Sequence, residues 1–229
     1  MIDWHSHVLP KMDDGSGSVE ESLKLILMQQ QQGVSKIIAT PHFLANDESV
    51  DLFLERREAS FKLLKPNLSD KAPQIILGAE VKYYEGISRL AQLKSLRIEG
   101  SNLLLLEMPF SKWSDYMVRE ITELSLMGDV NLVLAHIDRY LPLQSQNVWN
   151  YIFESDILTQ VNASFFAGLA TRRKALGMLK QGRIDFIGSD CHNLAQRPPQ
   201  LDKAYGYIEK KLGIDFINQM NEYGESMLV

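Results

Sequence analysis

Short apolar runs alternate with longer amphipathic segments along almost the whole chain. The apolar runs are nearly continuous, which is the pattern of strands buried on both faces of a parallel sheet. They predict strands at residues 2–5, 35–40, 74–80, 102–107, 130–135, 157–162 and 184–189. The amphipathic segments predict helices near residues 18–32, 48–64, 86–95, 114–127, 145–154, 170–181 and 199–212, with a closing helix over 214–223.

The first helix has clear start and stop signals. Ser18 is its candidate N-cap, and Glu21 completes a capping box. Gly33 follows the last turn, where helices commonly end. Seven strand–helix units in succession predict an α/β fold with helices covering a parallel sheet. A closed or nearly closed barrel is favoured over an open doubly wound sheet, and no glycine-rich dinucleotide or P-loop motif follows any strand.

Composition and charge narrow the class of protein. The 229 residues, of which 45% are hydrophobic and 23% charged, fit one globular domain spanning 1–229. A net charge of −5 argues against nucleic-acid binding, which needs a basic surface. The single cysteine, Cys191, excludes an intramolecular disulfide and suits a reducing cytosol. With no secretory-type leader and no apolar run of about 18 residues, we expect a cytoplasmic protein without direct membrane insertion.

All five histidines lie at or just beyond the C-terminal end of a predicted strand. His5 and His7 are two residues apart, so in a strand they point to the same face. His42, His136 and His192 follow the second, fifth and seventh strands. The C-terminal ends of parallel strands converge on one face of an α/β fold, where active sites are found. We therefore expect the five imidazoles to meet there.

Carboxylates occupy similar positions. Glu80 and Glu107 end two further strands, Asp190 follows the seventh strand together with His192, and Asp13 and Asp14 lie in the loop after the first strand. Mixed nitrogen and oxygen ligands suit Mn²⁺, Zn²⁺ or Fe²⁺ better than Ca²⁺ or Mg²⁺ alone. Because these ligands exceed the needs of one ion, the pattern favours two or three.

Each position also has a simpler explanation. Asp13 and Asp14 before a glycine can form an Asx turn, Glu107 can cap a buried strand through an ion pair, and His42 can be an ordinary loop residue. These explanations would have to hold at every position at once. They also give no reason why no histidine lies elsewhere in the chain.

Two arginines stand close to these residues in the sequence. Arg139 is three residues beyond His136, and Arg197 is five beyond His192. A guanidinium group binds phosphate oxygens in a bidentate manner, so both are candidates for phosphate binding. Alternatively, Arg139 pairs with Asp138 or another surface acid, and Arg197 caps a loop.

The spacing of Cys191 and Arg197 is that of cysteine-dependent tyrosine phosphatases, Cys-x₅-Arg. Phosphate loops of that kind usually contain glycine at their tight bends, and this segment has none. The neighbouring Asp190 would raise the pKa of a thiol rather than lower it. We expect Cys191 to be a small buried residue behind the ligand loop.

Several motifs together resemble one superfamily. The chain contains, in order, DWHSH, MDDGSGSVEES, ATPHF, GAEVKYY, LLLLEMPF, AHIDRY, SDCHN and RPP. These motifs resemble the polymerase and histidinol phosphatase (PHP) superfamily. Within it they are most similar to the bacterial metal-dependent protein-tyrosine phosphatases that regulate capsule and exopolysaccharide synthesis, the CpsB/CapC-like family. The resemblance covers about residues 1–212.

The resemblance implies a distorted (β/α)₇ barrel with a centre of two to three divalent metals, usually Mn²⁺, with Fe, Zn or Mg as alternatives. The positions that match the family's metal ligands are His5, His7, Asp14, His42, Glu80, Glu107, His136, Asp190 and His192. Arg139 and Arg197 match its phosphate-binding arginines. The implied substrate and partner is the phosphotyrosine-bearing tail of a membrane-linked bacterial tyrosine kinase. The loop at 43–50 is acidic, whereas some relatives carry basic residues there.

The implied chemistry is hydrolysis of a phosphomonoester by water that bound metals activate. Arg139 and Arg197 would stabilise the equatorial phosphoryl oxygens, and Asp190 or His192 would shuttle a proton to the leaving phenolate. Three alternatives stay open: a phosphatase for histidinol phosphate or another small phosphomonoester, a PHP-type nuclease, and a non-catalytic scaffold that binds the kinase. The absence of a basic stripe weighs against the nuclease, and the complete set of matching ligands weighs against the scaffold.

Overall fold

The computed structural model describes residues 1–228 as an α/β fold. Its strands are β1 (Ile2–Ser6), β2 (Lys36–Ala39), β3 (His42–Phe43), β4 (Gln74–Leu77), β5 (Glu80–Lys82), β6 (Leu103–Glu107), β7 (Asn131–Leu134), β8 (Leu158–Asn162) and β9 (Phe186–Gly188). Its helices are α1 (Val19–Gln31), α2 (Val50–Leu64), α3 (Asp115–Ser125), α4 (Gln146–Phe153), α5 (Ala163–Ala167), α6 (Arg172–Lys180), α7 (Leu201–Leu212) and α8 (Ile214–Ser226). Among these described helices, none is long and apolar enough to cross a membrane.

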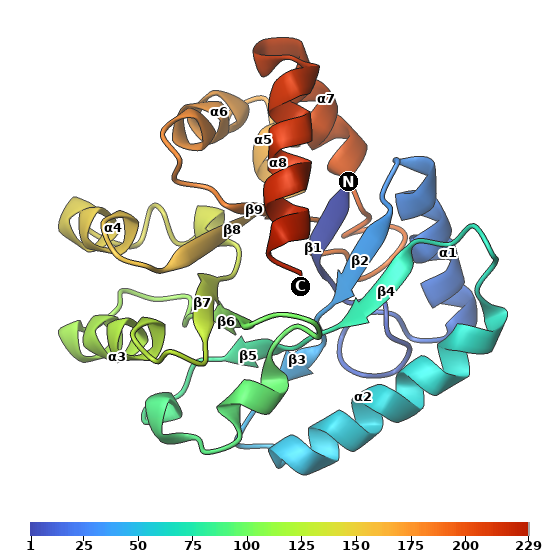
Figure 1. Ribbon diagram of the computed structural model, residues 1–229, viewed down its shortest axis with the longest axis horizontal. Coiled ribbons are helices and arrows are strands. Elements are labelled where there is room, and N and C mark those ends of the chain that lie inside the picture. The colour runs from blue at the N-terminus through green and yellow to red at the C-terminus, as the bar shows by residue number, and fades with distance from the viewer. Residues whose placement is uncertain (229) are drawn as a thin grey trace.

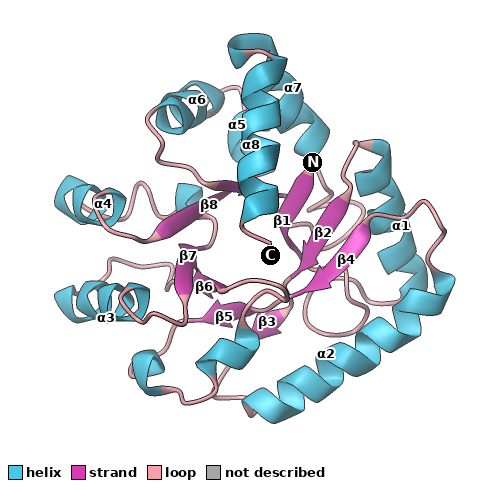
Figure 2. Cartoon of the chain, viewed as in Figure 1, coloured by secondary structure: helices cyan, strands magenta, loops and turns pink. Residues whose placement is uncertain are grey.

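All strand pairs are parallel, and the helices lie outside the strands (Figures 1 and 2). The strands form a three-stranded sheet, β1-β2-β4, and a six-stranded sheet, β3-β5-β6-β7-β8-β9. A parallel bridge from Ser6 to Cys191 brings the end of β1 beside the end of β9. The two sheets therefore curl into a distorted barrel, which confirms the predicted fold class.

The chain passes from the first sheet to the second at two places, between β2 and β3 and between β4 and β5. Pro41 stands between β2 and β3, where it cannot donate a ladder hydrogen bond. Gly78 and Ala79 stand between β4 and β5. Beyond each bend the chain joins the six-stranded sheet as β3 and as β5, where His42 pairs in register with Glu80. These two predicted ligands therefore lie side by side.

The helix predicted over 86–95 is wrong. Two 3₁₀ turns, Ile87–Arg89 and Leu93–Leu96, replace it. Ile87 and Leu93 are both buried, but on an α-helix they would lie about 120° apart, so one helix could not bury both well. The sequence also does not predict the five-residue helix α5, because so short a segment gives no periodic pattern.

Helix α8 closes the N-terminal end of the barrel (Figure 1). Tyr223 stacks on Phe186 with ring centroids 5.9 Å apart, and Met227 contacts the apolar cluster inside the barrel. That cluster comprises Ile2, Trp4, Ile38, Ile76, Ile98, Leu103, Leu105, Val133, Ala135 and Phe186. These apolar side chains fill the N-terminal half of the barrel. A polar site can therefore lie only at the C-terminal ends of the strands.

Candidate metal centre

The nine predicted ligand positions gather at the C-terminal ends of the strands. Three groups of side chains each offer ligand atoms within 4.8 Å of one another: His5, His7 and Asp190; His7, Asp14, His42 and His192; and His42, Glu80 and Glu107. His136 joins them through its Nε2, which lies 2.8 Å from Glu80 Oε1. Every position that the sequence nominated is therefore in one continuous cluster.

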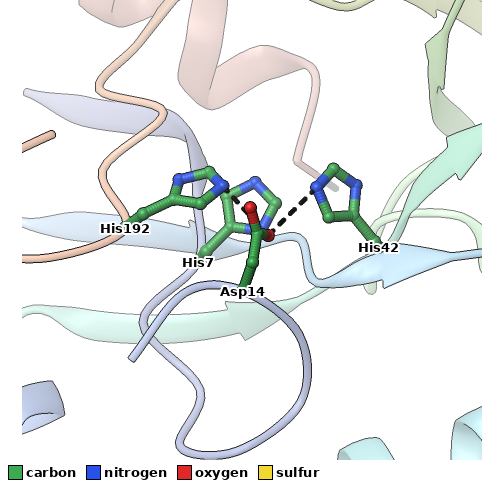
Figure 3. Close-up of side chains that lie close together, drawn as sticks. All are labelled: His7, Asp14, His42 and His192. Carbon is green, nitrogen blue, oxygen red and sulfur yellow. Dashed lines mark ion pairs between the residues drawn. The ribbon is translucent and has the colours of Figure 1, made fainter. Parts of the chain in front are cut away.

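Asp14 connects two histidines from opposite sides of the mouth (Figure 3). Its Oδ1 lies 3.4 Å from His42 Nε2 and 3.4 Å from His192 Nε2. His7 lies beneath, with its ring centroid 3.9 Å from that of His192. The Asp14 side chain is 66% exposed, so this part of the cluster opens to solvent.

Glu80 is the buried centre of the cluster. Its Oε2 lies 3.2 Å from His5 Nε2, 3.3 Å from His7 Nε2 and 2.9 Å from His42 Nδ1, and its Oε1 faces His136. Burial alone would raise the pKa of Glu80, but His5, the hydrogen bond from His136 and the close approach of His42 hold it well below its ordinary value. One carboxylate with two oxygens among four imidazoles is suited to bridging metals.

Two histidines are held so that Nε2 faces the centre. His7 Nδ1 donates to Asp13 Oδ2 at 2.7 Å, and His192 Nδ1 donates to the Asp190 carbonyl at 3.0 Å. Metal-binding histidines characteristically use one ring nitrogen in this way, which leaves a lone pair on the other. The buried Nε2 of His192 has no hydrogen-bond partner within residues 1–228. The donor set therefore fits a metal centre.

The electrostatics of the cluster favour cations. His5 Nε2 and His7 Nε2 lie only 3.1 Å apart, so both ring nitrogens face one point. Burial disfavours a protonated His7, yet Asp13 and Glu80 raise its pKa to about 10. Burial and the nearby His7 lower the pKa of His192 to about 4, which keeps that ring neutral at pH 7, the form that binds metals. The same negative surroundings that stabilise a proton would stabilise a divalent metal.

Asp13 has a function that the sequence analysis did not identify. It does form the Asx turn considered there, since Gly15 N–H donates to its Oδ1 at 2.9 Å. Its Oδ2 accepts from His7 and, at 2.9 Å, from the backbone N–H of His42. Gly15 is required at this turn because a Cβ there would lie 2.4 Å from His7 Cβ. Asp13 thus orients His7, and the adjacent Asp14 is free to face the mouth.

Arg139 and Arg197 meet at one carboxylate. Arg197 Nη2 lies 2.7 Å from Asp190 Oδ1, and Arg139 pairs with Asp190 Oδ2. Burial would raise the pKa of Asp190, but His5 and Arg139 lower it well below the usual range. Both arginine side chains are 34% exposed, so they stand between a buried candidate ligand and solvent. Asp138, the alternative partner of Arg139, accepts instead from the backbone N–H of Asn162.

Two of the candidate ligands have left-handed backbone conformations. His136 has φ 32° and Asp190 has φ 50°, and Lys11 is the other non-glycine residue with positive φ in the described chain. Such a conformation costs a non-glycine residue on the order of 1–3 kcal/mol and is typical of functional sites. The surrounding contacts must therefore hold these two side chains in place.

Cys191 is not positioned to be a nucleophile. Its side chain is fully buried and its Sγ accepts from Gln29 Nε2 at 3.4 Å. Burial and the negative charges of Asp3 and Asp190 raise the pKa of the thiol far above its ordinary value. A protonated, inaccessible thiol cannot attack a phosphate ester, so the Cys-x₅-Arg spacing has no catalytic meaning here.

Comparison with known proteins agrees with this geometry. The model of the family described as "Capsular polysaccharide synthesis, CpsB/CapC" matches residues 1–227. The tyrosine-protein phosphatase YwqE of Bacillus subtilis is 28% identical over 100% of this chain and 91% of its own length. The tyrosine-protein phosphatase CpsB of Streptococcus pneumoniae is 32% identical over 93% of this chain and 91% of its own.

A solved structure is similar along the whole chain. It comes from crystal structures of YwqE from Bacillus subtilis and CpsB from Streptococcus pneumoniae, described as unique metal-dependent tyrosine phosphatases. It superposes with a TM-score of 0.84 at 25% identity and covers 100% of this chain and 94% of its own. On the family match, the relatives and the shared fold, this chain belongs to the CpsB/CapC family of capsular polysaccharide synthesis proteins.

Proposed function

We propose that this protein is a metal-dependent protein-tyrosine phosphatase. The observation that carries the proposal is the cluster of histidines and carboxylates around buried Glu80, with two arginines at its edge. Relatives that align along most of the chain are named tyrosine-protein phosphatases. Its substrate would be the phosphotyrosine tail of a membrane-linked bacterial tyrosine kinase that controls capsule or exopolysaccharide synthesis, reached from the cytoplasm.

The centre would hold two to three divalent metals, with Mn²⁺ first and Fe, Zn or Mg as alternatives. Its ligands would be the members of the three groups, His5, His7, Asp14, His42, Glu80, Glu107, Asp190 and His192, together with His136 beside Glu80. When bound, such metals neutralise phosphoryl oxygens and lower the pKa of water. The mixed imidazole and carboxylate donors support a transition metal of intermediate softness.

The residues around the mouth would bind and orient the phosphoryl group. Arg139 and Arg197, each about one-third exposed, would exchange their contacts with Asp190 for the equatorial oxygens of the phosphate. Asp190 and His192 both have lowered pKa values and so are unprotonated at neutral pH. Asp190 is suited to accept the proton of the attacking water and pass it to the leaving phenolate, through the carboxylate oxygen that does not hold a metal. His192 is less suited, because its Nδ1 donates to the Asp190 carbonyl and its Nε2 would hold a metal.

A substrate panel tests this assignment. With Mn²⁺ supplied, a phosphotyrosine peptide should be hydrolysed with at least about tenfold higher kcat/KM than histidinol phosphate, a difference of about 1.4 kcal/mol in transition-state binding. Phosphoserine peptide serves as the control for peptide binding without an aryl leaving group. A preference for histidinol phosphate would identify a small-molecule phosphatase, and binding without turnover would identify a scaffold.

A further inference from the structure

Strand β8 carries no candidate ligand, yet its C-terminal end is polar and buried. Gln160 is 0% exposed and Asn162 is 5% exposed. They are two residues apart, so they lie on the same face of the strand. Burying a side-chain amide is costly unless its hydrogen bonds are made. The hydrogen bonds of these two amides therefore indicate which side chains they position.

Gln160 reaches two candidate ligands with one oxygen. Its Oε1 accepts from the backbone N–H of His136 at 2.6 Å and faces His5 Nδ1 at 3.4 Å. Gly188 on β9 makes room for this approach, since a Cβ there would lie 2.5 Å from His5 Cβ and 2.8 Å from Gln160 Nε2. His136 is one of the residues with a left-handed backbone, so the bond to its N–H helps to fix that conformation.

Asn162 extends the contacts to a third ligand. Gln160 Nε2 donates to Asn162 Oδ1 at 3.3 Å, and Asn162 Nδ2 donates to Asp190 Oδ2 at 2.8 Å. A chain of hydrogen bonds thus runs from His5 on β1 and His136 beyond β7, through β8, to Asp190, two residues beyond β9. The two amides of β8 connect three ligand positions that come from different strands.

We propose that Gln160 and Asn162 act together as an amide relay that positions His5, His136 and Asp190 for metal binding. The inference rests on the proposed metal-dependent function. A carbonyl oxygen can only accept, so it holds the proton of His5 on Nδ1 and leaves the lone pair of Nε2 facing the cluster. The amide performs for His5 what Asp13 performs for His7, but adds no negative charge to a site already rich in carboxylates.

The test measures metal affinity rather than turnover alone. Gln160→Met keeps the length of the side chain and removes the acceptor. Mn²⁺ titrated into the metal-stripped variant by calorimetry should bind about 10- to 100-fold more weakly than to the wild type, the range found when an outer partner of a metal ligand is lost. The kcat/KM for a phosphotyrosine peptide should fall at limiting Mn²⁺ and recover at least partly at saturating Mn²⁺.

Thr159→Val is the matched control. Thr159 is 2% exposed on the same strand, and its Oγ1 donates to the Arg183 carbonyl at 2.9 Å, away from the cluster. This variant loses a buried hydrogen bond and should keep wild-type Mn²⁺ affinity. Wild-type affinity in Gln160→Met would overturn the proposal, as would an equal loss in both variants.

If Gln160→Met does not fold, Asn162→Ala tests whether the two amides position the metal ligands. It should weaken Mn²⁺ binding by several-fold at a thermal midpoint close to that of the control, and unchanged affinity would overturn the relay. The wild type separates this inference from the proposed function. A wild type that binds Mn²⁺ but does not hydrolyse phosphotyrosine would refute the phosphatase assignment. The comparison of Mn²⁺ affinity between the wild type and the variants would still test the relay.

Discussion

Replacing Glu80 with glutamine should remove metal from more than one site and lower phosphatase activity by roughly 10²- to 10³-fold, the scale of losing a preorganised electrostatic group. The expectation follows from the two oxygens of Glu80, which face four imidazoles from different strands. Glutamine keeps the shape but offers one weaker, uncharged oxygen. Metal content by mass spectrometry and kcat/KM on a phosphotyrosine peptide measure the two effects.

The exposed Glu123 on α3 provides the control for this substitution. Glu123→Gln removes the same charge far from any candidate ligand and should change neither quantity. Loss of a single ion from Glu80→Gln, with the remaining metal and most of the activity intact, would contradict a bridging position for this carboxylate.

Arg139→Ala and Arg197→Ala should each lower kcat/KM by about 10- to 150-fold, because a hydrogen bond to a charged group contributes about 1.5–3 kcal/mol. Metal content should stay the same or rise, since both guanidinium groups now pair with Asp190 and their removal frees that carboxylate. The exposed Arg173 on α6 gives the control substitution. Full activity in both variants would make these arginines ordinary surface residues, whereas loss of metal would assign them a structural function.

The fold was largely predictable because parallel strands buried on both faces leave a strong apolar signal. The bend at Gly78 was not predictable from hydrophobicity, since Leu77 and Ala79 on either side are both apolar, and Pro41 indicates where a strand ends but not that the next residues join a second sheet. Those bends matter, because they bring His42 into register with Glu80. The failure at 86–95 has a different cause: its apolar residues suggest a helix, and only contact with the rest of the molecule selects two short turns.

The ligand positions could be nominated because the chemistry of the site coincides with strand ends. The residues that hydrogen-bond to these ligands and orient them could not be predicted from the sequence. Asp13 and Asp14 are adjacent carboxylates, and only the turn at Gly15 decides which one orients His7 and which one faces the mouth. Gln160 and Asn162 repeat the spacing of His5 and His7, a signal present in the sequence but carried by amides that occur in many strands.

If residues from separate strands form one multinuclear metal centre that hydrolyses phosphotyrosine, metal content and phosphatase activity must depend on each other. Metal content by mass spectrometry, combined with phosphatase activity before and after EDTA treatment, measures this dependence. We expect at least two transition-metal ions per chain when the protein is metal-replete, loss of turnover with EDTA, and recovery when Mn²⁺ is restored. One ion or none with full activity, or turnover that resists the chelator, would contradict it.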